Sequence, residues 1–424
     1  MFKTLLGHPD AEQFIREFQE EHQSEVEFLL RQRQRCFHAP DRSWLDAEQM
    51  EARLDRHMDA LRAGGHVALR SARQLIAEGD MGQFMAAVHV LASLAPEESS
   101  ISRVLEVRIE SDEELLPSWF EAIALARHPE WVSVCIQAAL HERPLIRATA
   151  ARLLGYRREG EHEHLIRLLR EDADSKVRST AALSLAHLGY GPALPLVEQS
   201  LSHLPPDDAE PMLRAALLLG SSRALQVCRQ LCQSNTPSPP LVRLLALAGR
   251  EQDVPLLRRL CARSSLASSA FEALGILGIA STIPELIEHL ASPQLALRLA
   301  AASALALVTG AGLTQKVHIP DEEDEDAPDR AVEQPSTDEK AWRHWWKDHA
   351  SHFQKAMRFR HGRPFSPTAC LDELEAARSS FQVRARATLE LALLLGQAPS
   401  IEPDWPIHRQ RQVLVRWRRL LRTK

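Results

Sequence analysis

Apolar residues between positions 165 and 189 recur at helical spacing in two short blocks. The first block is Leu165, Ile166, Leu168 and Leu169, and acidic residues then interrupt it. The second block begins near Asp174 and Ser175, either of which can cap a helix, and ends at Gly189. Its apolar positions are Val177, Ala181, Ala182, Leu185 and Leu188. The pattern predicts two short antiparallel helices, and the alanines of the second predict close packing against a neighbouring helix.

A block like the second one returns along the chain at intervals of about 30 residues. Each copy of the block has an arginine near its start, except for one copy, which has Ala267 at that position. These arginines are Arg147, Arg178, Arg214, Arg243 and Arg298, and the pattern resumes once more at Arg384. Such a period is typical of a solenoid of helical repeats. We expect the arginines to pair with turn carboxylates of the same or the adjacent repeat and to form a structural ladder.

Residues 131–310 resemble HEAT repeats, in their variety with short units. We therefore expect an all-α fold: a HEAT-like helical-repeat solenoid with an amino-terminal helical cap and a carboxy-terminal helical extension. The composition agrees, because the 424 residues are 45% apolar but only 5% aromatic and are rich in helix formers. The expected regions are a helical region at 1–115, the repeat array at 116–310, an acidic linker at 311–340, and a helical region at 341–424 with a resumed repeat and a capping helix.

The segment 311–340 contains six consecutive carboxylates, from Asp321 to Asp326. Such a run repels itself and offers no apolar side chain to bury, so we expect a disordered linker. Calcium binding is the alternative, but the run lacks the alternating ligands and the glycine of a calcium loop.

Cysteine and histidine spacing predicts neither a metal site nor a cofactor site. Only Cys228 and Cys232 lie one helical turn apart, and further ligands at matching spacing are missing. His344, Asp348 and His352 are spaced by four but lack another strong ligand. The chain has no run of about 20 apolar residues, as a membrane span requires. We expect a cytoplasmic protein with buried thiols.

Regions outside the array resemble a narrower family. Its signature near the amino terminus is carried by His22, Glu25, Phe28, Leu29 and Arg33 and by "LDRHMDALRAGG" at 54–65. Its far end is matched by "WWKDHASHFQKAMRFRHGRPFSP" at 345–367 and "VRARATLELALLLG" at 383–396. These stretches resemble a bacterial family of HEAT-repeat proteins found near type VI secretion gene clusters, although Leu30 stands where a tryptophan is expected. The resemblance implies an accessory or cargo-loading role, with a secretion-system component or effector as partner.

A tryptophan cluster follows the acidic segment. Successive helical residues lie about 100° apart, so the neighbours Trp345 and Trp346 cannot both point squarely into one narrow core. Aromatic side chains ringed by cations are typical of binding hot spots. We therefore predict a partner-binding site at Trp345, Trp346, Arg358 and Arg360. The alternative is that both tryptophans join the resumed repeat to the array.

The sequence contains no glycine-rich phosphate loop after a strand, no G-x-S-x-G and no H-E-x-x-H motif. We predict a non-enzymatic protein-binding scaffold or adaptor, because a repeat solenoid offers an extended surface for a protein partner. Two alternatives stay open. One is a tetrapyrrole lyase, which resemblance to another HEAT-like class implies. The other is nucleic-acid binding by the basic helix at 408–424, against which the net charge of −6 argues.

Overall fold

The computed structural model of the chain consists mainly of α-helices, so the predicted all-α class is confirmed. It describes residues 11–39, 42–108, 112–160, 162–204, 208–234, 237–319, 330–354, 357–397 and 401–422. The chain divides into two compact units. Unit 1 comprises Met1–Val197, Ala377–Phe381 and Ser400–Arg416, and unit 2 comprises Glu198–Ala376, Gln382–Pro399 and Trp417–Lys424. The division lies inside the segment 116–310, which we expected to form a single array.

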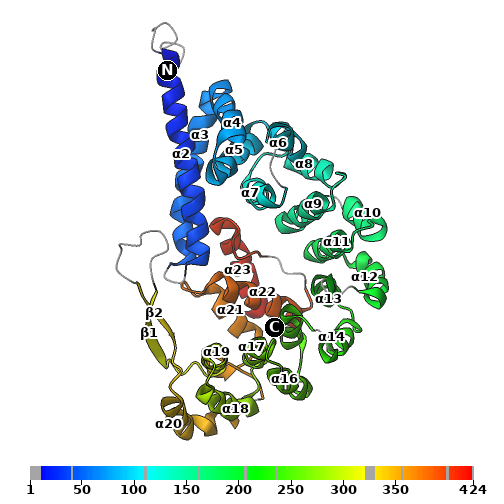
Figure 1. Ribbon diagram of the computed structural model, residues 1–424, viewed down its shortest axis with the longest axis vertical. Helices are drawn as coiled ribbons and strands as arrows, with labels where there is room; N and C mark the ends of the chain where they lie inside the picture. The colour runs from blue at the N-terminus through cyan, green and yellow to red at the C-terminus, as the bar shows by residue number, and fades with distance from the viewer. Residues whose placement is uncertain are drawn as a thin grey trace. The chain divides into compact units, whose positions relative to one another are not determined.

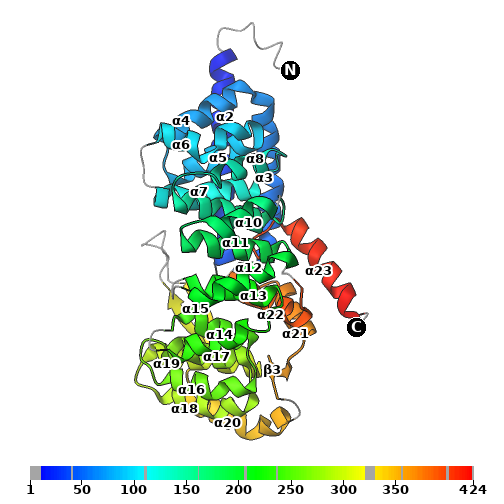
Figure 2. The ribbon, with the colours of Figure 1, turned by 90° about the vertical axis from the view of Figure 1, so that its right-hand side faces the viewer.

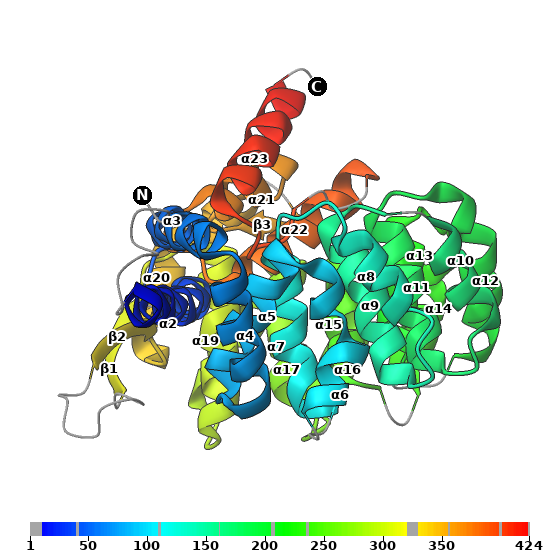
Figure 3. The ribbon, with the colours of Figure 1, turned by 90° about the horizontal axis from the view of Figure 1, so that it is seen from above.

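Unit 1 contains an inner row of helices with shorter helices outside it (Figures 1 and 3). Its helices are α2 (Ala11–His38), α3 (Ala47–Gly64), α4 (His66–Glu78), α5 (Met81–Leu94), α6 (Ile101–Val107), α7 (Asp112–Leu125), α8 (Trp131–Ala138), α9 (Pro144–Arg157), α10 (His162–Glu171) and α11 (Ser175–His187). Helices α5, α7, α9 and α11 pack in succession, while α8 and α10 pack on α9 and α11. The long helix α2 packs on α3, α4 and α5.

The helix pair predicted between 165 and 189 is α10 and α11. The Asp174 side chain accepts a hydrogen bond from the Val177 N–H at 3.0 Å and so caps α11 as predicted. Ala181 and Ala182 are fully buried. Helices α9 and α11 approach so closely that a Cβ on Gly155 would lie 2.4 Å from Ser184 Oγ. Small residues therefore set the spacing of the inner row.

Unit 2 repeats this arrangement. Its repeat helices are α13 (Ala209–Leu218), α14 (Ala224–Gln233), α15 (Pro239–Ala248), α16 (Val254–Cys261), α17 (Ala267–Leu277), α18 (Ile283–Glu288) and α19 (Leu295–Thr309). Helices α13, α15, α17 and α19 form the inner row, and α14, α16 and α18 pack outside it (Figure 2). Gly275 of α17 faces Ala304 of α19, where an added Cβ would lie 2.6 Å from the Ala304 Cα. The helix α12 (Leu194–Ser200) spans the division between the units.

We expected a disordered linker at 311–340. The structure instead has two paired strands there, one near each end of the segment. Strands β1 (Thr314–Ile319) and β2 (Arg330–Pro335) are antiparallel, with Val317 opposite Val332. The β-branched side chains of β1 favour a strand, and Ser336 N–H extends the pairing by donating to the Leu313 carbonyl at 2.9 Å. The acidic run at 321–326 lies outside the described residues.

The chain after β2 forms α20 (Glu339–His349), β3 (Phe359–Arg360), β4 (Arg363–Pro364), α21 (Pro367–Glu375), α22 (Phe381–Leu395) and α23 (Ile407–Arg422). The β3–β4 hairpin covers the carboxyl ends of α17 and α19. Phe359 N–H donates to the Gly278 carbonyl at 2.8 Å, and the N–H groups of His361 and Gly362 donate to the carbonyls of Leu307 and Val308 at 2.7 and 2.9 Å. These bonds satisfy carbonyls that a helix end leaves free.

The segment 401–410 belongs to unit 1. Trp405 is buried and donates from Nε1 to the Tyr156 carbonyl at 3.0 Å, while the Tyr156 hydroxyl bonds to Asp404 at 3.0 Å. The Ile407 N–H donates to Glu51 at 2.9 Å. This segment therefore contacts α9 of the inner row.

The ladder arginines hold turns and neighbouring helices in place. In Arg147, Arg178 and Arg298, Nη1 donates to the carbonyls five and six residues earlier, in the turn before each helix, at 2.7–3.2 Å. Arg147 also forms two hydrogen bonds with Asp172, at 2.7 and 2.8 Å. The remaining contacts join Arg214 to Glu210, Arg243 to Glu272 of α17, and the buried Arg384 to the Leu374 carbonyl.

Candidate partner-binding groove

Helix α20 carries the tryptophan cluster and is fixed at its start by Asp338. The Asp338 carboxylate accepts hydrogen bonds from the N–H groups of Lys340 and Ala341 at 2.9 and 3.2 Å. Trp342, one turn later, is fully buried and donates from Nε1 to the Ser336 carbonyl at 2.7 Å. These contacts fix which face of α20 is buried.

Trp345 and Trp346 are both half-buried, but they have different surroundings. The Trp345 ring stacks on His349 of the same helix, with ring centroids 4.3 Å apart and planes 6° apart. Both rings also contact Phe353, with centroids 5.4 Å apart for Trp346 and 6.0 Å apart for Trp345. Trp346, and not Trp345, lines a groove in unit 2.

The groove has a volume of about 460 Å³ and two walls. One wall consists of Trp346, Ala350, Phe353 and Met357, and the other of Ile279, Ala280, Ser281 and Pro284. Glu251 and Gln354 complete the lining. Met357 is 58% exposed. We name this feature the Trp346 groove.

Backbone contacts hold the two walls of the Trp346 groove together. Ala280 N–H donates to the Met357 carbonyl at 3.1 Å, and Ile279 forms an isolated antiparallel bridge with Arg358. The contacts lie beside α18, against which α20 packs (Figures 1 and 2). The groove is therefore built from repeat and carboxy-terminal segments of one unit.

The lining of the Trp346 groove suits binding better than chemistry. Its described side chains are mainly apolar, with one carboxylate, Glu251, and no histidine, cysteine or lysine. Nucleophilic or acid–base catalysis needs two or more such groups within hydrogen-bond reach of each other. An aromatic ring beside an exposed methionine can instead hold an apolar side chain of a partner.

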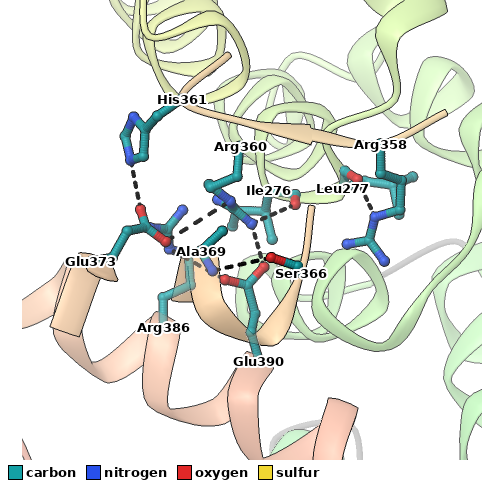
Figure 4. A network of polar contacts seen from close by, with 10 residues as sticks. All are labelled: Ile276, Leu277, Arg358, Arg360, His361, Ser366, Ala369, Glu373, Arg386 and Glu390. Carbon is teal, nitrogen blue, oxygen red and sulfur yellow. Dashed lines mark hydrogen bonds and ion pairs between the residues drawn. The ribbon is translucent and has the colours of Figure 1, made fainter. Parts of the chain in front are cut away.

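Arg358 and Arg360 do not ring the tryptophans, which corrects that part of the prediction. Arg360 is 1% exposed, and Arg358 is half-buried with its guanidinium 4.0 Å from the centre of the Phe365 ring. Arg358 Nε donates to the Leu277 carbonyl at 2.8 Å, and Arg360 Nη2 donates to the Ile276 carbonyl at 3.0 Å (Figure 4). Both cations lie at the carboxyl end of α17, where a helix favours positive charge.

A buried network of charges surrounds Arg360 (Figure 4). Its guanidinium pairs with the buried Glu390 of α22 and lies 3.9 Å from Glu373 of α21. Glu373 is also paired with Arg386 and accepts a hydrogen bond from His361 at 2.8 Å. Burial opposes ionisation of Glu373, but the His361 hydrogen bond and the nearby arginines outweigh it and lower its pKa. The network joins the β3–β4 hairpin to α21 and α22.

Sequence reasoning missed the wall formed by Ile279, Ala280, Ser281 and Pro284, because these residues lie about 70 positions from Trp346 and carry no motif. A signal for the hairpin was present. His361 and Gly362 have φ values of +48° and +73°, and a glycine between short alternating segments is typical of a tight hairpin turn.

Other candidate sites gain little support. His344 and Asp348 are 4.0 Å apart and exposed. In the described part of the chain, no three histidine, cysteine or acidic side chains are placed to hold a metal. Within the same residues, every helix is too short or too polar to cross a membrane.

A family model described as HEAT repeats matches residues 119–186. No curated protein sequence matches the chain. Human deoxyhypusine hydroxylase in complex with glycerol is a similar solved structure, with 14% identity over 70% of this chain and 98% of its own and a TM-score of 0.24. An engineered protein is 16% identical over 88% of this chain and 99% of its own, with a TM-score of 0.29. Karyopherin Kap121p, bound to the extreme C-terminus of the protein phosphatase Cdc14p, is 15% identical over 95% of this chain and 45% of its own, with a TM-score of 0.25.

The fold assignment rests on the arrangement of the helices and on the family match. The narrower bacterial subgroup stays a prediction. Residues 119–186 are similar to HEAT repeats, and the described fold is an all-α, HEAT-like array of helical repeats.

Proposed function

We propose that this protein is a cytoplasmic, non-enzymatic protein-binding scaffold or adaptor, and that the Trp346 groove is one of its binding surfaces. The observation that carries the proposal is an open apolar groove beside a half-buried tryptophan, on an array of helical repeats. Repeat arrays bind proteins through surfaces assembled from neighbouring units. The groove has this construction, because its walls come from the α17–α18 connection and from α20 and the residues that follow it.

The partner chemistry follows from the lining. Trp346, Phe353 and Met357 offer rings and a flexible thioether to an apolar side chain. Glu251 at the edge offers an acceptor to a donor beside that side chain. We propose a partner segment with an apolar anchor and an adjacent hydrogen-bond donor.

Trp346→Ala tests this proposal, with Trp345→Ala as its matched control. Both tryptophans are half-buried on α20, but only Trp346 lines the groove. Tagged full-length variants would be purified from cells that naturally produce the protein, and the captured proteins measured by quantitative mass spectrometry beside each variant's melting temperature. Each captured protein would then be purified and tested for direct binding to the wild type. For one that binds, we expect Trp346→Ala to weaken the binding free energy by about 2 kcal/mol or more, which is about 30-fold in affinity.

Trp345→Ala should affect that affinity far less than Trp346→Ala, since Trp345 does not line the groove and its ring stacks on His349, meeting Phe353 only edge-on at 6.0 Å between centroids. Equal affinity of the wild type and a stably folded Trp346→Ala variant would overturn the assignment of the groove. Turnover of a substrate by the purified protein would overturn the non-enzymatic role.

The process in which the scaffold acts is a finer proposal. The likeness of residues 345–367 and 383–396 to a bacterial HEAT-repeat family supports an accessory or cargo-loading role in type VI secretion. The partner would then be a secretion-system component or effector. Recovery of such a protein with the wild type, and its loss with Trp346→Ala, would support this role, whereas partners unrelated to secretion would contradict it.

A further inference from the structure

Three phenylalanines on α2 are unusually exposed. Phe14, Phe18 and Phe28 are 54%, 36% and 48% exposed. The other large apolar side chains with comparable exposure in the described chain lie outside α2, and none of them is aromatic: Val107, Leu140, Leu295, Met357, Leu394 and Val415. A cluster of exposed aromatic rings on one helix differs from the scattered apolar residues of an ordinary surface.

The three rings share one face of the helix. At about 100° and 1.5 Å per residue, they fall within an arc of roughly 80° and along a length of about 21 Å. The rings of Phe14 and Phe18 stack, with centroids 6.2 Å apart and planes 16° apart. The neighbouring side of α2 packs on α3, α4 and α5 (Figures 1 and 3). Helix α3 also borders the phenylalanine face, because its Arg53 pairs with Glu25 and its His57 bonds to His22, on which the Phe18 ring packs. The exposed rings therefore form a second apolar stripe, beside the stripe that packs inside unit 1.

Acidic side chains accompany these rings. Residues 11–28 contain six glutamates and one arginine. Glu17 and Glu21 are exposed and lie on or beside the phenylalanine face, while Glu25 is half-buried and paired with Arg53 at 3.1 Å. The surface thus combines apolar rings with negative charge.

We propose that this face of α2, formed by Phe14, Phe18, Phe28, Glu17 and Glu21, binds a basic amphipathic helix of a partner protein. A straight face about 21 Å long matches about four turns of a partner helix. The apolar stripe of that helix would cover the rings, and its lysines or arginines would meet the glutamates. A second copy of α2 suits the face poorly, because two acidic faces would repel each other. This surface lies in unit 1 and is independent of the Trp346 groove.

The test uses the full-length chain and two fluorescent 16-residue helical peptides. Both peptides carry leucine at the apolar heptad positions, and the other positions are lysine in one and glutamate in the other. Fluorescence anisotropy should show that the lysine peptide binds and the glutamate peptide does not. The affinity for the lysine peptide should fall as salt is added.

The variant that tests the face is the triple change Phe14→Ser, Phe18→Ser and Phe28→Ser. Its matched control is Leu140→Ser with Leu295→Ser, which removes two side chains that are each 56% exposed on other elements. The triple variant should bind the lysine peptide at least about tenfold more weakly, since aromatic anchors dominate such interfaces. The control, and Trp346→Ala, should bind it as the wild type does.

The triple variant could bind the lysine peptide as tightly as the wild type does, with an unchanged circular dichroism spectrum. That result would show that net charge alone attracts the peptide, and it would overturn the proposal. Self-association of the wild type in sedimentation equilibrium that the triple variant lacks would also overturn it, because the occupant would then be a second copy. Loss of peptide binding in the control as well as in the triple variant would contradict it too.

Discussion

Arg360 is a fully buried charged residue whose guanidinium lies between the Glu390 carboxylate and the Ile276 carbonyl. A buried charge is tolerated only when opposite charges and hydrogen bonds replace the water it loses. Arg360 obtains both, because the β3–β4 hairpin directs it to the carboxyl end of α17 and to the carboxylates of α21 and α22. At the residue scale, this side chain links the carboxy-terminal segment to the repeats of unit 2.

Replacing Arg360 by alanine should therefore destabilise unit 2 strongly. The change leaves the buried Glu390 with only the longer ion pair to Arg386, at 4.0 Å. Breaking a buried ion pair in this way costs about 3–5 kcal/mol. The control is Arg363→Ala on the same hairpin, whose side chain is 77% exposed and 3.5 Å from Asp372, and whose loss should cost less than about 1 kcal/mol. Urea denaturation of both variants measures the difference. Equal stabilities would contradict the structural role of Arg360.

His89 of α5 predicts a dependence of stability on pH. It is fully buried, its Nδ1 donates to the Ala122 carbonyl at 3.0 Å, and burial lowers its pKa. Below the usual histidine pKa of about 6.5, the unfolded chain binds a proton that the folded chain does not, so stability falls as pH falls. One such group contributes a slope of up to about 1.4 kcal/mol per pH unit.

The slope can be measured from urea unfolding at several pH values between 7.5 and 5.5. The variant His89→Gln should show a shallower slope than the wild type. Part of the dependence of stability on pH should remain in this variant, because burial and the nearby His22 also lower the pKa of His57. An unchanged slope in His89→Gln would show that His89 is not the titrating group.

At the scale of elements, inner helices α17 and α19 meet at Gly275 and Ala304, just as α9 and α11 meet at Gly155 and Ser184. The hairpin β3–β4 then covers the carboxyl ends of α17 and α19. Close helix contact and end coverage together fix the position of these two helices. The helices in turn position Ile279 and Ala280, which form part of one wall of the Trp346 groove.

Gly275→Ala should destabilise unit 2 although alanine favours helices. The new methyl would lie 2.6 Å from the Ala304 Cα, and because that atom is backbone, the helices would have to separate. Overpacking of this kind costs about 1–3 kcal/mol. Gly191→Ala is the control, since its added Cβ meets nothing within 4 Å. A thermal melt of both variants tests the contact, and a raised melting temperature for Gly275→Ala would contradict it.

Local sequence patterns were sufficient to predict the repeat helices, but they could not predict the contacts of the β3–β4 hairpin. The cap at Asp174 and the buried Ala181 and Ala182 follow from spacing within one helix pair. Arg360 was misassigned because its partners lie 84 residues before it and 30 residues after it, and a sequence with alternating arginines indicates an exposed surface. The Trp346 groove could be predicted only on its tryptophan side, because its other wall depends on how the α17–α18 connection meets Met357.

At the scale of the whole molecule, the two units each offer a candidate binding surface. Unit 2 has the apolar Trp346 groove, and unit 1 has the acidic, aromatic face of α2. The two surfaces differ in chemistry, so each would select a different partner segment. An adaptor needs two such independent surfaces, and we propose that the Trp346 groove is one of them.

Hydrogen–deuterium exchange of the purified full-length protein, alone and with its captured partner, tests that claim most directly. We expect the partner to slow exchange in the two groove walls, at residues 279–284 and at 346–354 with Met357, and Trp346→Ala to abolish this protection. Exchange at the buried inner-row helix α11, remote in sequence from the groove, should stay unchanged. Protection by the partner that lies entirely outside the two walls would show that the Trp346 groove is not a binding surface.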